Sequence, residues 1–178
     1  MSYSTEIASQ MVQYFEDDNA HYEFDEERGT LSANYSMGDD CAISSARLFA
    51  LVHDNGFTIY MKVRGINAKK KNFGNLALFL AYVNDGMRYG NFEFDLDDGE
   101  VVFKYSSIVP EGADLDYDYF DHIVLLSLAM LDKYADGLIA MMLGYSDDPE
   151  AHTRSAWRMT TKSLFGILFT RLFGRFCR

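Results

Sequence analysis

The chain has 178 residues, a hydrophobic share of 48%, two prolines and a formal net charge of −11. A chain of this length suits one domain and buries roughly 70% of its unfolded surface, so it does not need a metal or a disulfide to fold. The few prolines argue against a long disordered linker. The strong acidity argues against nucleic acid as a partner, because binding to phosphates requires cationic groups.

The first part of the chain is predicted to form a helix followed by two β-hairpins. Residues 5–17 place apolar side chains on one helical face, and Ser4 or Thr5 is a suitable N-cap. Residues 21–37 alternate apolar and polar side chains on both sides of a turn that ends in glycine, and residues 46–65 repeat this design with an apolar strand over residues 48–52 and an alternating strand after the turn. That alternation around a glycine turn is typical of a β-hairpin.

The second part of the chain alternates helical and hairpin patterns again. Residues 67–84 carry an apolar face so wide that we expect this helix to be buried on most sides. Residues 92–105 predict a third hairpin, and residues 114–144 predict two helical faces that meet at a bend near Asp136–Gly137. The resulting order, α-β-β-β-β-α-β-β-α-α, predicts an α+β domain in which an antiparallel β-sheet of hairpins is packed with helices.

The acidic turn Asp97-Asp98-Gly99 is the first candidate for a chemical site. An EF-hand loop needs aspartate or asparagine at positions 1, 3 and 5 and glycine at position 6. With Gly99 at position 6, positions 1 and 3 are Phe94 and Leu96, whose apolar side chains cannot bind calcium. We therefore interpret the segment as a tight hairpin turn, which favours Asp and Gly, with a weak surface cation site as the alternative.

Other sequence features give little support for catalysis. The sequence has no HExxH, CxxC, GxSxG or phosphate-binding motif, and its four histidines are scattered. The acids of residues 114–121 surround a predicted helix start, where they complement the helix dipole; a catalytic carboxylate pair is the minor alternative. Cys41 stands beside Asp39 and Asp40, whose charges would raise the pKa of its thiol. We expect no enzyme, no catalytic residues, no metal site and no cofactor.

The cysteines and the N-terminal residues bear on the compartment. Cys41 and Cys177 are far apart in the sequence, which favours a reducing environment. The first residues lack the basic and apolar regions of a signal peptide, and no run of about 18 apolar residues predicts a membrane-spanning helix. We therefore expect a cytoplasmic protein.

The block from residue 75 to residue 112 resembles the YbjN family of small bacterial proteins. In that family a buried helix that ends in asparagine, here Asn84, precedes a Gly-x-Phe strand, here Gly90–Phe94, an acidic turn with glycine and a return strand. The resemblance covers about residues 5–152 and brings no catalytic residues. It implies a fold similar to type III secretion chaperones, an α/β sandwich that often forms dimers. It also brings the label of a sensory-transduction regulator.

Residues 153–178 lie beyond this resemblance and have the pattern of a basic amphipathic helix. Residues 150–178 carry a net charge of +5, which leaves −16 for residues 1–149. We therefore expect a YbjN-like domain over residues 1–152 and a C-terminal helix or tail over residues 153–178. The tail residues predicted to bind a partner or a membrane are Trp157, Phe165, Leu168, Phe169, Arg171, Leu172, Phe173, Arg175 and Phe176.

Three roles are open for this tail. It docks on the chain's own sheet or on a dimer mate, it lies in the interface of an anionic membrane, or it enters a groove of another protein. The function expected from the whole sequence is a non-enzymatic protein-binding module, chaperone-like or regulatory. It would act as a homodimer whose acidic body favours a basic protein partner of unknown identity. The alternative is a peripheral membrane adaptor held at the inner face of the membrane by the tail.

Overall fold

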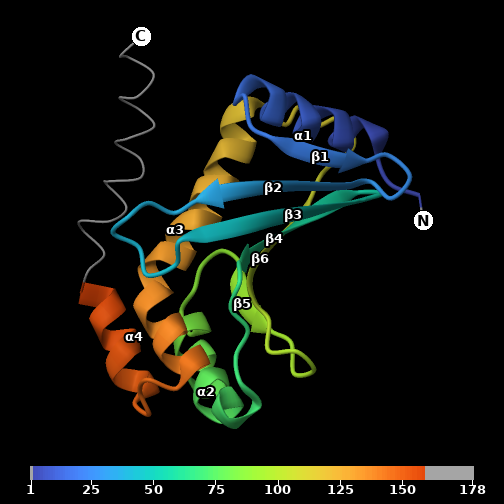
Figure 1. Ribbon diagram of the computed structural model, residues 1–178. Coiled ribbons are helices and arrows are strands. Elements are labelled where there is room, and N and C mark those ends of the chain that lie inside the picture. The colour runs from blue at the N-terminus through green and yellow to red at the C-terminus, as the bar shows by residue number, and fades with distance from the viewer. Residues whose placement is uncertain (1, 159–178) are drawn as a thin grey trace.

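A computed structural model describes residues 2–158 of the chain, and its six strands form one antiparallel sheet (Figure 1). The strands follow one another across the sheet in the order β1-β2-β3-β4-β6-β5. They are β1 (Tyr22–Asp25), β2 (Thr30–Ser36), β3 (Ser45–His53), β4 (Gly56–Val63), β5 (Asn91–Phe94) and β6 (Val101–Ile108). Only the last pair departs from chain order, because the β5–β6 hairpin turns so that its second strand pairs with β4.

The α-helices of the described residues cover one face of this sheet. They are α1 (Thr5–Asp17), α2 (Phe73–Asn84), α3 (Tyr117–Leu143) and α4 (Pro149–Arg158), and a short 3₁₀ turn, η1 (Lys70–Asn72), leads into α2. Figure 1 shows α3 passing behind the sheet from α1 at one end to α2 and α4 at the other. The sheet and the helices therefore form two layers with the core between them.

The alternation of side chains decides which face of the sheet is buried. The register places Ala33 opposite Leu48, Leu48 opposite Met61, and Met61 opposite Phe103. These four side chains and Phe92 of β5 point toward the helices, and each is at most 3% exposed. Because side chains alternate along a strand, the intervening residues of the same strands point away from the helices.

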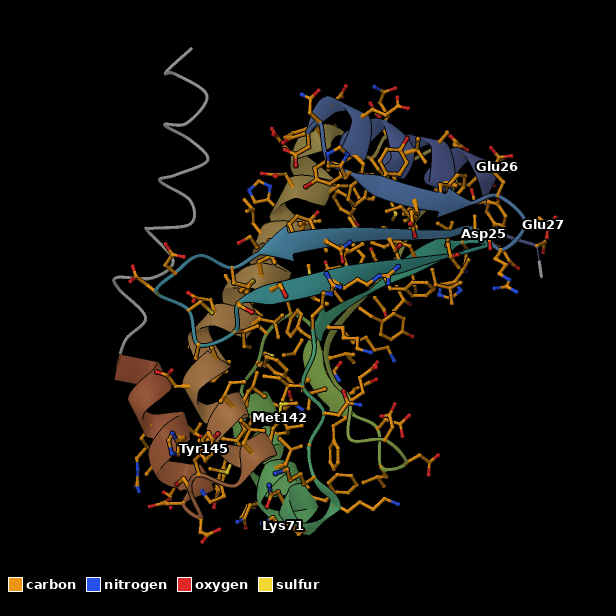
Figure 2. The ribbon with its side chains drawn as sticks, in the orientation of Figure 1. Asp25, Glu26, Glu27, Lys71, Met142 and Tyr145 are labelled. Carbon is orange, nitrogen blue, oxygen red and sulfur yellow. The ribbon has the colours of Figure 1, made fainter. Side chains whose placement is uncertain are left out.

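Capping residues fix where the helices begin and end. The Ser4 hydroxyl accepts a hydrogen bond from the Ile7 amide at 3.3 Å, which confirms Ser4 as the N-cap of α1. α3 ends at Leu143 and is capped by Gly144, whose φ of +76° is the left-handed conformation that glycine adopts most readily. There the side chain of Asn72 donates to the Met142 carbonyl at 3.0 Å, and thereby ties the start of α2 to the end of α3. Figure 2 shows Met142 and Lys71 at this end of the molecule, far from the acidic β1–β2 turn.

At the other end of the molecule, α1 packs against α3. Tyr14 is 2% exposed, and its hydroxyl donates to Asp121 at 3.4 Å, while the hydroxyl of Tyr117 donates to Asp18 at 3.1 Å. Aromatic rings fill the space between the two helices, with the Tyr14 and Tyr117 centroids 5.1 Å apart. The first helix of the domain is thus held largely by the last long one.

The structure confirms the α+β class and corrects two details that were predicted from the sequence. The bend expected near Asp136–Gly137 is wrong, because α3 is continuous. A Cβ at Gly137 would lie 2.5 Å from the Phe79 ring, so glycine here allows α2 to approach closely. The helix expected over residues 67–84 begins later, at Phe73; one of its sides is exposed and the other sides are covered. α4 spans the expected boundary between residues 152 and 153, and residues 159–178 lie outside the description.

Candidate functional site

The face of the sheet opposite the helices has no helix over it in the described part of the chain. We call it the open face. One row of side chains crosses it from β1 to β5, in the order Glu23, Ser32, Phe49, Tyr60, Lys104 and Asn91. Phe49 is 42% exposed, although a large aromatic side chain is normally buried. An exposed aromatic residue in the middle of a sheet face is a candidate contact for a ligand.

A groove of about 490 Å³ lies on this open face. The sheet residues form its floor, and the β5–β6 hairpin forms one wall. Its lining residues are Arg47, Phe49, Tyr60, Lys62, Glu93, Phe94, Asp95, Glu100 and Val102. We refer to this set as the groove. Its volume falls within the range of ordinary ligand sites, about 300–1,000 Å³.

The floor of the groove is mainly aromatic, and a lysine from outside the lining lies against it. Phe49 and Tyr60 are direct cross-strand partners, and Val102 of β6 is the cross-strand partner of Lys62. The Lys104 ammonium lies 5.8 Å from the centre of the Tyr60 ring, within the range of a cation–π contact. The floor therefore offers aromatic surface to an apolar side chain.

Ion pairs hold the charged side chains around the floor. Lys62 pairs with Glu100, Lys104 Nζ lies 3.2 Å from Glu93 Oε1, and Arg47 lies 3.6 Å from the carboxylate of Glu23. All these groups are partly exposed, so each pair contributes little to stability. Their effect is to fix the positions of the charges. The lining of the groove has the carboxylates of Glu93, Asp95 and Glu100 and the cations of Arg47 and Lys62, so its carboxylates outnumber its cations by one.

A row of hydroxyl groups continues the open face beyond the groove. The His53 ring Nε2 lies 3.1 Å from the Thr58 hydroxyl, which in turn lies 3.1 Å from the Ser106 hydroxyl. Thr58 is 6% exposed, so these contacts satisfy a hydroxyl that water barely reaches. From the sequence His53 could be assigned only to a turn, since its Thr and Ser neighbours come from other strands.

In the acidic turn of the β5–β6 hairpin, carboxylates accept hydrogen bonds from backbone amides of the turn itself. Asp95 accepts from the Asp97 amide at 2.7 Å, and Asp98 accepts from the Glu100 amide at 2.8 Å. Gly99 has φ +78°, and a Cβ there would lie 2.3 Å from the Ala68 carbonyl oxygen. The segment is thus the tight turn expected from the sequence. Among residues 2–158 no three His, Cys, Asp or Glu side chains are grouped so that they could hold a metal ion.

The thiol of Cys41 is protonated at neutral pH. Burial raises its pKa to about 12; a backbone hydrogen bond to Ile43 opposes this rise, and a hydrogen bond to Asp132 adds to it. The sequence predicted a raised pKa, but from the adjacent acids Asp39 and Asp40. The charges that contribute come instead from α3, where Asp132 and Asp136 face the thiol.

A smaller hollow of about 340 Å³ lies between the start of α1 and the segment that follows β6. Its lining includes Glu6, Asp54 and Glu111, together with Gln10, whose side chain donates to the Ala113 carbonyl at 3.5 Å. It lacks the exposed aromatic floor of the groove, so we regard the groove as the better candidate site.

The site residues predicted from the sequence fall elsewhere. Trp157 lies within the span of α4, and the remaining predicted residues, from Phe165 to Phe176, lie outside the described residues. The groove was not predicted from the sequence. A signal was present, because Phe49 and Tyr60 occupy positions of β3 and β4 that alternate with the core residues.

Comparison with known proteins supports the fold alone. No protein-family model and no curated protein matches the chain. Among solved structures, the crystal structure of YbjN from E. coli, for which a role in transcription regulation has been suggested, matches with a TM-score of 0.54 and 16% sequence identity. The match covers 78% of this chain and 94% of that one. The chain therefore has a YbjN-like fold. Within residues 2–158 no helix has the length and apolar character needed to cross a membrane.

Proposed function

We propose that this chain is a non-enzymatic, regulatory protein-binding module that holds a partner segment in the groove of the open face. The exposed Phe49 beside Tyr60 is the observation that carries this proposal. An uncovered aromatic floor loses contact with water when a partner's apolar side chain covers it, and such aromatic anchors dominate binding energy in protein interfaces. The suggested regulatory role of the YbjN relative agrees with this class of function.

The charges around the floor indicate which segment fits best. The groove has a small excess of carboxylates, and the neighbouring turn adds the exposed Asp97 and Asp98. A partner segment with one large apolar side chain and flanking Lys or Arg residues complements both the floor and the rim. The partner's charges would mainly set its association rate and selectivity, because exposed ion pairs add little affinity.

Selection from a library of random peptides displayed on phage tests this proposal, because it does not require the partner to be identified first. We expect enriched peptides to carry an aromatic or large aliphatic residue next to Lys or Arg. Their affinity for the Phe49→Asp variant should fall by about tenfold or more, as expected for loss of an anchor. Ile108→Asp is the control, since Ile108 is 81% exposed and lies outside the groove. Equal losses in both variants, or no enrichment at all, would contradict the proposal.

A further inference from the structure

Helix α2 exposes an uncharged stripe to solvent. Its sequence, FGNLALFLAYVN, has no charged residue, whereas 24% of the whole chain is charged. The exposed positions recur at intervals of three and four residues and so form one line along the helix. We call this set the α2 stripe; it consists of Gly74, Ala77, Leu78, Ala81 and Tyr82. Leu78 is 49% exposed and Tyr82 is 40% exposed.

The other sides of α2 are already occupied. Leu76, Phe79, Leu80 and Val83 point into the core. Asn84 bonds to β5, so that side of the helix is covered as well. An exposed helix surface without a single charge is unusual, because surface helices normally carry polar residues on the side that faces solvent. The α2 stripe therefore has the composition of a contact surface.

The described chain ends beside this stripe. Asn75 near the start of α2 donates to Asp147 at 2.9 Å, just before α4 begins. Further along, the Phe79 ring and His152 both border Gly137 of α3. The two helices thus run side by side in the same direction, and Figure 1 shows both at the same end of the molecule. From His152 to Arg158, α4 advances about 9 Å, which brings it level with the C-terminal end of α2.

The remaining segment has the length and chemistry to cover the stripe. Residues 159–178 continue from α4, and the amphipathic pattern within them extends from residue 165 to residue 176. As a helix, these twelve residues would measure about 18 Å, which equals the length of α2. Residues 159–164 are enough for a reversal, since connections between packed helices commonly have about 2–8 residues.

The two surfaces also complement each other in size. The α2 stripe has small residues at Gly74, Ala77 and Ala81, which let another helix approach closely. The tail has large side chains, mostly phenylalanine, at the matching intervals. The tail is also basic, while residues 1–149 carry a net charge of −16. The glycines at positions 166 and 174 weaken an isolated helix, so this segment gains most from a partner surface.

We propose that residues 165–176 dock as a helix on the α2 stripe of the same chain, antiparallel to α4. The groove of the open face is a poorer site for the tail. It lies on the opposite side of the sheet from the helical layer that α4 joins, and charged side chains surround its floor. This docking does not depend on the proposed function of the groove.

Limited digestion of the full chain with trypsin tests this docking, because the enzyme cleaves after Arg171 and Arg175 only when the helix opens. We expect cleavage at these bonds to be at least about tenfold slower in the chain than in a synthetic peptide of residues 159–178. Leu78→Glu should accelerate cleavage about five- to tenfold, because it places a charge in the contact. Leu96→Glu is the control, since Leu96 is 68% exposed in the β5–β6 turn; it should leave the rate unchanged.

Four results would overturn the proposal. Cleavage of the intact chain at the rate of the free peptide would show an undocked tail. Protection that Leu78→Glu leaves intact would place the tail on another surface. Protection that grows with protein concentration would identify a second copy as the occupant. Protection that develops only after addition of vesicles containing anionic lipid would assign the tail to a membrane surface.

Discussion

The side chain of Asn84 gives the sharpest prediction for the stability of this fold. At the end of α2 it donates to the Phe92 carbonyl at 2.8 Å and accepts from the Phe92 amide at 2.8 Å. It thus satisfies both backbone groups that Phe92, in the edge strand β5, turns away from β6. One amide side chain takes the place that a neighbouring strand would otherwise fill.

Asn84→Ala should lower the free energy of unfolding by about 2–3 kcal/mol. Each hydrogen bond contributes roughly 1 kcal/mol, and the backbone of Phe92 has limited access to water, which raises the loss. Phe92 itself is 2% exposed. Urea unfolding followed by circular dichroism measures the change. The matched control is Asn91→Ala in the same strand, because the Asn91 side chain bonds only to the exposed Glu93 carboxylate at 3.2 Å; its effect should stay within about 0.5 kcal/mol.

Asn84→Asp separates the two bonds. The carboxylate still accepts from the Phe92 amide, but its second oxygen faces the Phe92 carbonyl, so a proton between them is favourable. The pKa of the new carboxyl in the folded state is therefore raised above its unfolded value. The variant regains stability as the pH falls through that raised pKa and loses it again as the pH rises. A deficit relative to the unmodified chain that is equal at pH 4 and pH 7, or equal losses for the two alanine variants, would refute this account of Asn84.

Other features of the molecule give three further predictions. Cys41, with its pKa at about 12, should react with iodoacetamide at pH 8 roughly 50-fold more slowly than glutathione. Few thiolates form at that pH, and the higher nucleophilicity of each thiolate compensates only in part. Equal rates of reaction, measured by mass spectrometry, would contradict this prediction. Gly144→Ala should lower the free energy of unfolding in urea by about 2–3 kcal/mol, and Gly38→Ala by about 1 kcal/mol. Both glycines have positive φ, but only at Gly144 would a Cβ lie within 3 Å of Asn72. Equal losses of stability would show that the Asn72 contact is unimportant. The family resemblance predicts a homodimer, so light scattering should give twice the chain mass for the full chain and for residues 1–158; monomers in both would end that expectation.

Local patterns were enough to predict most of the elements. α1 begins after a serine cap and has one apolar face, and each hairpin has two strand-like segments around a glycine turn. These signals depend on neighbours in the sequence, which is why residues 5–17 and the three hairpins were predicted nearly as they are found. The α+β class then follows from their order. The resemblance around Asn84 pointed to the right residue, while its bonds to β5 required the structure.

The parts that were not predicted depend on contacts between distant residues. Gly137 in a helical pattern suggested a bend, whereas its role is to admit the Phe79 ring from another helix. The groove likewise needs Phe49 and Tyr60 from one hairpin and Glu93 and Glu100 from another. No periodicity within a single segment contains that information, since it arises when β6 pairs with β4.

The contact between α1 and α3 determines when the domain can close during synthesis. The bond from Tyr14 to Asp121 joins residues 107 positions apart, and the bond from Tyr117 to Asp18 joins residues 99 positions apart. A chain leaving the ribosome forms its first helix and its first two hairpins early, because those contacts are local. Their apolar surfaces remain open to solvent until α3 has emerged. A nascent or truncated chain that stops before residue 117 therefore exposes the apolar face of its sheet. Chaperone binding and aggregation compete with folding until the last third of the chain has been synthesised.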